Sequence, residues 1–216
     1  LVAYHRTFWK NSFMNTVTIT FLEKILPRLR TGKALVAPSR NGDEAIWLAR
    51  KGFVVTAYDR DPTLVAKLAT RASAEQVKIT AESKNLDVVI LPLMSFDTII
   101  LTGEKPITRY FSEIIRALAQ GGTAVVEGWT AEEAIRVGPE KLDHKLCYRA
   151  NELLGLLKDL HILYYSEEIV DGRHLVRCLA RKPAHKDMIK YGFAEQRPGD
   201  EKKSAAVLAA EKLFKK

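Results

Sequence analysis

The stretch that decides the fold runs from Lys33 to Asp59 and reads KALVAPSRNGDEAIWLARKGFVVTAYD. It begins with a short apolar segment and passes through a tight loop into a helix pattern. Gly52 then marks a turn before a second apolar segment that ends in an acid. A strand, a helix and a second strand in this order form half of a nucleotide-binding βαβ unit.

The loop between the first strand and the helix departs from those that hold cofactors. Such turns carry several glycines, which let the backbone approach the ligand. Here Pro38, Ser39, Arg40 and Asn41 carry side chains, and Gly42 is the one glycine left. Pro38 has no backbone N–H to donate, and Arg40 brings a long cation to the place of a ligand. We therefore expect an intact fold with a degraded cofactor loop.

Apolar segments and helix patterns continue to alternate on both sides of this stretch. Residues 15–29 place their apolar side chains on one face, which predicts an amphipathic helix that Pro27 ends or kinks. Asp61-Pro62 predicts the start of a helix that fades by Ala74. The later segments predict strands at 77–81, 95–101 and 123–127, and Gly121-Gly122 predicts a turn before the last of them. Helices are expected at 106–119 and 149–157, and an irregular stretch at 83–94.

The pattern ends differently from how it begins. Residues 161–170 and 174–182 predict two strands joined by Asp171-Gly172, a two-residue hairpin signal. The predicted fold class is therefore α/β, with a mostly parallel seven-stranded Rossmann-like sheet, helices on both faces and a C-terminal antiparallel hairpin. The expected organisation is a lead-in and helix at 1–32, an α/β domain at 33–183 and a basic extension at 184–216, with a helical stretch at 203–214.

Several runs of this sequence resemble the class I S-adenosylmethionine-dependent methyltransferases, and within them the tellurite-resistance and thiopurine methyltransferase group. The run from Ala34 to Ala72 is similar to the first half of that group, and YHRTFW at 4–9 is similar to its aromatic lead-in. SFDTIIL, ALAQGGTAVVEGWT and GRHLVRCLARKP are similar to its fourth strand, fifth strand and final hairpin. The resemblance covers residues 4–183 and implies a Rossmann-like methyltransferase fold.

The resemblance also implies a set of cofactor residues. Where the family has an acid and two glycines for the methionine part of the cofactor, this chain has Val36, Pro38 and Arg40. Asp59 matches the acid that binds the ribose hydroxyls, although it also suits a turn before Asp61-Pro62. Glu82 lies near the acid that meets adenine, although it also suits a solvated loop. If S-adenosylmethionine binds, the expected contacts are Ser39, Arg40, Gly42, Asp59, Arg60 and Glu82.

Catalytic machinery is not visible in the sequence. The segment after the fourth predicted strand, LTGEKPITRY, lacks the Asn-Pro-Pro-Tyr run of amino-methylating enzymes. The five histidines are scattered, and Glu127 and Trp129 suit either a pocket mouth or wall packing. Cys147 and Cys178 lie far apart without a CxxC partner, so we predict no metal site. No apolar run approaches the roughly 20 residues that span a bilayer.

The charge of the chain points to a polyanionic partner. The formal net charge is +8, and cations concentrate beyond residue 184. The expected RNA contacts are Lys186, Lys190, Arg197, Lys202, Lys203, Lys212, Lys215 and Lys216. Residues 1–22 contain no acid, which loosely suits the neighbourhood of an organellar transit peptide. We therefore expect a location in the mitochondrial matrix, with a cytoplasmic one as the alternative.

Three functions fit these observations. The first is a catalytically inactive methyltransferase-like protein that serves as a structural or assembly subunit of a ribonucleoprotein, with RNA and proteins of the mitochondrial ribosome as partners and no cofactor. The second is an active S-adenosylmethionine-dependent methyltransferase acting on a small molecule or RNA. The third is a module that binds an anion or acidic peptide in the old cleft through Arg40 and Arg60.

Overall fold

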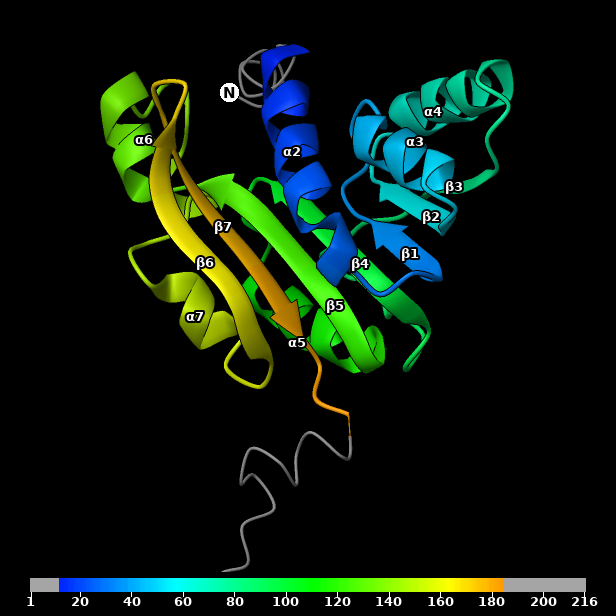
Figure 1. Cartoon of the computed structure of the whole chain (residues 1–216). Helices are drawn as coiled ribbons and strands as arrows, with labels where there is room; N and C mark the ends of the chain where they lie inside the picture. The colour runs from blue at the N-terminus through cyan, green and yellow to red at the C-terminus, as the bar shows by residue number, and fades with distance from the viewer. Residues whose placement is uncertain (1–11, 185–216) are drawn as a thin grey trace, which may run out of the picture. The chain divides into compact units, whose positions relative to one another are not determined.

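The computed structural model describes residues 12–184 and is built on a seven-stranded sheet (Figure 1). By its contacts the chain divides into a unit Leu1–Lys182 and a unit Pro183–Lys216, and the fold below is that of the first. The strand order is β3-β2-β1-β4-β5-β7-β6. The strands are β1 Lys33–Val36, β2 Val54–Asp59, β3 Ile79–Ser83, β4 Phe96–Gly103, β5 Leu118–Trp129, β6 His161–Val170 and β7 Arg173–Arg181.

The sheet is parallel except for one strand. β1 pairs in parallel with β2 and β4, and the same holds for β2 with β3 and β4 with β5. β7 runs antiparallel between β5 and β6. The turn of the final hairpin has positive φ at both Asp171 (49°) and Gly172 (75°), as a two-residue primed turn requires. The predicted Rossmann-like sheet and its closing hairpin are confirmed.

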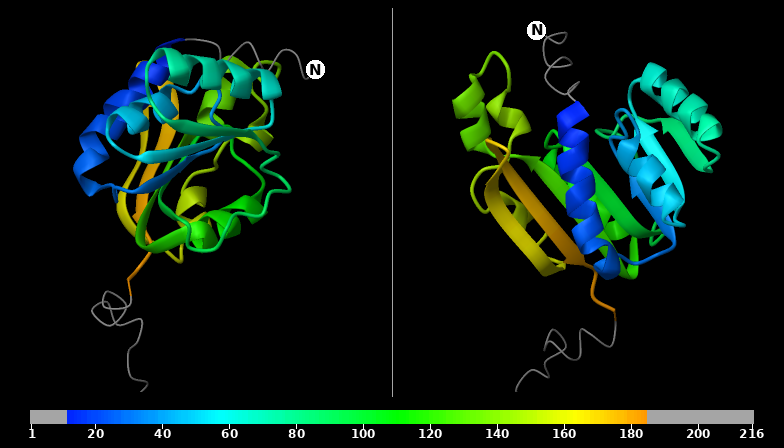
Figure 2. Two further views of the ribbon diagram at one scale, coloured as in Figure 1. Left: turned by 90° about the vertical axis from the view of Figure 1, so that its right-hand side faces the viewer. Right: turned by 45° about the horizontal axis from the view of Figure 1, so that its top comes forward.

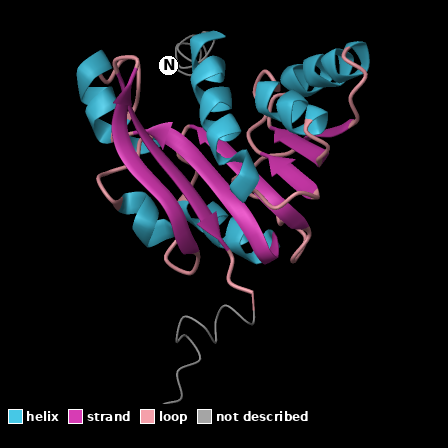
Figure 3. Cartoon of the chain, viewed as in Figure 1, coloured by secondary structure: helices cyan, strands magenta, loops and turns pink. Residues whose placement is uncertain are grey.

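Helices cover both faces of the sheet (Figures 2 and 3). Strand side chains alternate between faces, so Ala34 and Val36 of β1 join one core while Leu35 joins the other. The first core lies under α2, α3 and α4, and the second under α5 and α7. The helices are α2 Ser12–Ile25, η1 Leu26–Arg28 (a 3₁₀ turn), α3 Asp43–Arg50, α4 Pro62–Ala74, α5 Thr108–Ala117, α6 Ala131–Val137, η2 His144–Leu146 and α7 Glu152–Leu156.

Two helix boundaries follow from local chemistry, as the sequence predicted. α2 gives way to the 3₁₀ turn that contains Pro27, because proline cannot donate the next helical hydrogen bond. α4 begins at Pro62, and the Asp61 side chain caps it by accepting a hydrogen bond from the Thr63 N–H at 2.9 Å. The stretch from residue 84 to 95 has no regular helix or strand, also as predicted.

The structure differs from the sequence expectations in the bounds of three elements and contains one further helix. Gly121 and Gly122 lie inside β5 and do not precede it, at an irregularity where the pairing with β4 passes from Leu118 directly to Thr123. A Cβ at Gly122 would lie 2.8 Å from the Ala119 carbonyl oxygen, so the glycine serves a close backbone approach there. The third strand is shifted to Ile79–Ser83, the helix expected at 149–157 is confined to α7, and α6 was not anticipated. The stretch expected to be helical at 203–214 lies outside the described residues.

Candidate functional site

The predicted cofactor site lies where the order of the strands reverses. β1 and β4 are neighbours in the sheet although they are not consecutive in the chain. Ligands of doubly wound sheets bind at such a switch point, outside the carboxyl ends of the strands. The loop that follows β1 carries Ser39, Arg40 and Gly42, and β2 ends at Asp59. The structure therefore brings these four predicted residues to one edge of the sheet, which we call the cofactor edge.

Arg40 bridges the switch point with its side chain. Its Nη2 donates to Glu44 Oε1 at 2.9 Å and to Thr102 Oγ1 at 2.5 Å. Glu44 lies in the first turn of α3 and is fully buried, whereas Thr102 belongs to β4. The Thr102 hydroxyl also donates to Glu44 Oε1 at 3.2 Å. A guanidinium thus joins the β1 loop to α3 and β4, in the region where the fold class holds its ligands.

The Asp59 carboxylate accepts hydrogen bonds from two backbone amides. Its Oδ2 accepts a hydrogen bond from the Arg40 N–H at 2.8 Å, and its Oδ1 accepts one from the Asp61 N–H at 3.0 Å. The residue is 4% exposed. Arg40 has φ of 49°, a left-handed backbone that L-residues adopt at some cost, and the Asp59 carboxylate holds its amide in place. Asp59 therefore fixes the loop and the start of α4, which is the role of a turn-forming acid.

Ser39 and Gly42 have structural neighbours of their own. Ser39 is buried, and its N–H donates to the Tyr58 carbonyl oxygen at 2.8 Å. Gly42 has φ of 85°, and a Cβ at this position would lie 2.3 Å from Cδ1 of Leu68 on α4. The one glycine kept in the loop is thus required by a left-handed turn and by the close approach of α4.

Arg60 and Glu82 lie at the same edge but outside the buried contacts. Arg60 is exposed. Glu82 belongs to β3 and does not follow it, its side chain is 42% exposed, and its Oε2 lies 3.4 Å from the Lys84 Nζ. Burial, and after it the charge of Glu82, raises the pKa of Tyr58 on the neighbouring strand. Their cofactor roles remain predictions.

A second buried polar network, which the sequence did not reveal, lies beneath α2. The Arg177 Nε donates to Glu127 Oε2 at 2.7 Å, and the Thr18 hydroxyl also donates to Glu127. Burial raises the pKa of Glu127, while the charge of Arg177 and the Thr18 hydrogen bond oppose that rise. Trp129 is fully buried in a small core with Leu142 and Leu175. Both Glu127 and Trp129 therefore belong to the packed interior.

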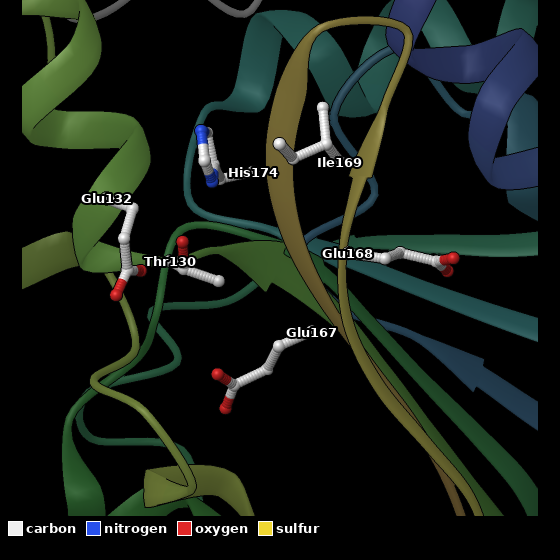
Figure 4. Close-up of a pocket in the computed structure, with 6 residues that line it drawn as sticks. All are labelled: Thr130, Glu132, Glu167, Glu168, Ile169 and His174. Carbon is white, nitrogen blue, oxygen red and sulfur yellow. The ribbon is translucent and has the colours of Figure 1, made fainter.

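A separate hollow of about 240 Å³ lies between the start of α6 and the β6–β7 hairpin (Figure 4). It is lined by Thr130, Glu132, Glu167, Glu168, Ile169 and His174. None of the predicted cofactor residues lines it. Two of its acids are already engaged, since Glu167 accepts from the Asn151 N–H at 2.7 Å and Glu168 from Ser166 Oγ at 3.0 Å.

The sequence predicted no metal site and placed the RNA contacts in the C-terminal extension. Within residues 12–184, no cluster of His, Cys, Asp and Glu side chains is arranged to hold a metal ion. Cys147 and Cys178 are both buried free thiols, and burial raises the pKa of each to about 12. In the same part of the chain, no helix is long and apolar enough to cross a membrane. The predicted RNA contacts from Lys186 to Lys216 lie outside the described residues.

Comparison with known families identifies the class of this protein. The profile of the family described as Tellurite resistance protein TehB matches residues 2–182. The chain therefore belongs to the TehB family, within the class I S-adenosylmethionine-dependent methyltransferase superfamily. A comparison with curated protein sequences gives no match.

Solved structures confirm the fold. TehB from Haemophilus influenzae superposes with a TM-score of 0.64 at 18% identity, over 76% of this chain and 62% of that one, so this chain spans less than two thirds of it. The N-methyltransferase NodS from Bradyrhizobium japonicum WM9 gives a TM-score of 0.63 at 13% identity, over 81% and 98% of the two chains. The [4+2]-cyclase SpnF gives 0.64 at 17% identity, over 79% and 81%. At these identities the likeness concerns the fold alone, and it includes a protein named for a reaction other than methyl transfer.

Proposed function

We propose that this protein is a methyltransferase-like subunit without methyltransferase activity, with a structural or assembly role in a ribonucleoprotein. The expected assembly is the mitochondrial ribosome. The observation that carries the first part is the contact of Arg40 with Glu44 and Thr102 at the switch point. The family and the fold supply the methyltransferase relationship, and the loss of activity is inferred from this contact.

The residues at the cofactor edge do not fit S-adenosylmethionine. A ligand at the switch point would have to displace the Arg40 guanidinium from fully buried Glu44, and breaking such a buried pair costs about 3–5 kcal/mol. Pro38 cannot donate a backbone hydrogen bond to the methionine part of the cofactor. We therefore assign no methyl-transfer step to this chain.

Charge and surface chemistry support a role in an assembly. The net charge of +8 favours a polyanion such as RNA, whose binding would then depend on salt. The irregular stretch before β4 exposes Val88, Ile90, Leu93 and Met94, each 50–69% accessible. Several exposed apolar side chains in one short stretch of chain suit a contact with a protein partner. The net charge therefore supports an RNA partner, and the exposed apolar side chains support a protein partner.

Active methyl transfer is the second candidate, because Asp59 and Gly42 are retained and the chain belongs to the TehB family. The third candidate, an anion- or peptide-binding module, would use Arg40 and Arg60 as its cations. The Arg40 guanidinium already neutralises Glu44, which leaves exposed Arg60 as the cation of that hypothesis. The contacts at the cofactor edge therefore favour the non-catalytic proposal over both.

Calorimetric titration of S-adenosylmethionine into the purified chain tests the loss of activity. We expect no saturable heat from the native protein. The variant Pro38→Gly/Arg40→Gly/Glu44→Gln, which removes the guanidinium and its buried charge together, should gain measurable affinity, while Pro38→Gly alone should not. Saturable 1:1 binding by the native chain would overturn the proposal.

Sedimentation tests the assembly role. The tagged full-length chain should migrate with ribosomal RNA in a mitochondrial lysate at low salt and should leave that fraction at high salt. Migration as a free protein at low salt would contradict the ribonucleoprotein part and leave the calorimetric result unaffected.

A further inference from the structure

We infer that the N-terminal edge of the sheet, opposite the cofactor edge, binds the phosphate backbone of RNA. This inference rests on the proposed ribonucleoprotein role and assigns that role to a surface of the folded unit. The residues concerned lie in η1 and the segment after it, at the start of β1, in the turn between α7 and β6, and at and just beyond the end of β7. We call them the basic edge: Arg28, Arg30, Lys33, Lys158, Arg181 and Lys182.

Backbone contacts bring these residues together from distant parts of the sequence. The Arg28 Nη1 donates to the Leu163 carbonyl oxygen in β6 at 3.3 Å. The Arg30 N–H donates to Thr123 Oγ1 in β5 at 3.2 Å, and Thr123 is in register with Arg181 of β7. Figure 1 shows that β6 begins and β7 ends at this same end of the sheet.

Three cations of the basic edge are available to a partner. Arg28, Lys33 and Lys158 are exposed and make no ion pair with residues of the described range. Of the other cations nearby, Arg30 lies 2.9 Å from Asp97, and partly buried Lys182 donates from its Nζ to two carbonyl oxygens at 2.8 and 2.9 Å. Arg28 also donates to a carbonyl oxygen, that of Leu163, but its side chain is exposed and no carboxylate of the described residues neutralises its charge. Arg28, Lys33 and Lys158 therefore provide the free charge of this edge.

The spacing of the cations suits a chain of phosphates better than a single small anion. Four inter-strand steps separate β1 from β6 in the strand order. At about 4.8 Å per step, Lys33 lies roughly 19 Å from the start of β6. That span is longer than a single phosphate group and covers several phosphates of one RNA strand. The basic edge thus matches a backbone that runs across the strands.

The opposite end of the sheet carries a different balance of charge. Asp59, Asp61 and Glu82 lie at or just beyond the ends of β2 and β3, beside the cations Arg40, Arg60 and Lys84, so charges of both signs are mixed there. Glu132 and Glu167 line the hollow near the hairpin. An RNA that served as a methyl acceptor would have to approach that edge. RNA held at the basic edge would instead be bound as a scaffold component, which separates the assembly role from catalysis.

Fluorescence anisotropy with a labelled single-stranded RNA of 20 nucleotides tests the inference on the full-length chain. The edge variant is Arg28→Gln/Lys33→Gln/Lys158→Gln. The matched control, Lys67→Gln/Lys141→Gln/Lys145→Gln, removes the same charge from exposed positions elsewhere. The loss of three phosphate contacts should make the fall of the logarithm of the association constant with the logarithm of salt concentration less steep by about 2. This corresponds to about 100-fold weaker binding at 0.1 M salt. The control should retain its affinity within about threefold, because it loses only long-range attraction.

Circular dichroism and urea unfolding establish that both variants are folded. Equal loss of affinity in the two variants, or no loss in the edge variant, would overturn the basic edge while leaving the proposed function in place. Tighter binding of the native chain to vesicles containing phosphatidylserine, lost in the edge variant, would assign this edge to a membrane surface. Failure of the native chain to bind any RNA would overturn both the inference and the ribonucleoprotein proposal.

Discussion

Replacing Arg40 with alanine should destabilise the folded protein by about 3 kcal/mol. The Glu44 carboxylate is fully buried and loses its cation in this variant, and removal of one partner of a buried pair costs about 3–5 kcal/mol. The Arg40 side chain is 19% exposed, so water can reach part of the site and the lower end of that range applies. For a chain of this length, about 3 kcal/mol lowers the melting temperature by roughly 6–12 °C.

A double-mutant cycle isolates the interaction. Arg40→Ala/Glu44→Leu removes both charges, so the double variant should be more stable than Arg40→Ala, with a coupling energy of about 2 kcal/mol. Arg40→Gly offers an internal comparison, since the φ of 49° suits glycine. It should be about 1–2 kcal/mol more stable than Arg40→Ala.

Urea unfolding followed by circular dichroism measures five proteins: the native chain, Arg40→Ala, Glu44→Leu, the double variant and Arg40→Gly. A loss below about 1 kcal/mol for Arg40→Ala, or a coupling energy near zero, would refute the buried pair. Displacing Arg40 from Glu44 would then cost little, and the non-catalytic proposal would lose its main support.

Two further predictions concern stability. Although burial opposes it, hydrogen bonds from a backbone N–H and from Lys105 hold the pKa of Glu152 below its usual value near 4.5. The stability that Glu152 contributes is therefore present above pH 4.5 and lost as the pH falls through the lower pKa of the folded state. In urea unfolding from pH 7 to pH 3, the free energy of unfolding should decline more steeply for the native chain than for Lys105→Gln. Equal declines would refute the contact. Gly42→Ala should lower the free energy of unfolding by about 1–2 kcal/mol because of its left-handed backbone, and by about 1–3 kcal/mol more because of the clash with Leu68. Gly52 has a similar φ and open space around it, so Gly52→Ala should show the backbone cost alone in thermal unfolding. Equal costs for the two variants would contradict the packing of Gly42 against Leu68.

Much of the fold could be predicted because the apolar periodicity is strong. The strands of a parallel sheet are buried on both faces, so β1 and β4 read as continuous apolar runs. The hairpin was readable from Asp171-Gly172, whose backbone geometry is local. The glycines of β5 misled because a Gly-Gly pair usually marks a turn, while here the neighbouring backbone of β5 requires the missing side chain. α6 is only seven residues long and gave too little periodicity to detect.

The candidate site was predictable in part. The loop residues and Asp59 could be placed because each follows directly from a strand end. Glu44 lies four residues after Arg40, but Arg40 belongs to the loop before α3 with φ of 49°, so the helical spacing rule did not predict their ion pair. Thr102 could not be found in this way, because the parallel pairing of β1 with β4 brings it to Arg40 from 62 residues away. The network of Thr18, Glu127 and Arg177 depends on three elements meeting in space and left no local pattern.

A crystal structure of the chain grown with excess S-adenosylhomocysteine tests the closed switch point most directly. We predict that the Arg40 guanidinium stays hydrogen-bonded to Glu44 and Thr102, with no nucleoside density beside Asp59. A nucleoside whose ribose hydroxyls bind Asp59, with Arg40 turned away from Glu44, would contradict that prediction and return the chain to the active methyltransferases.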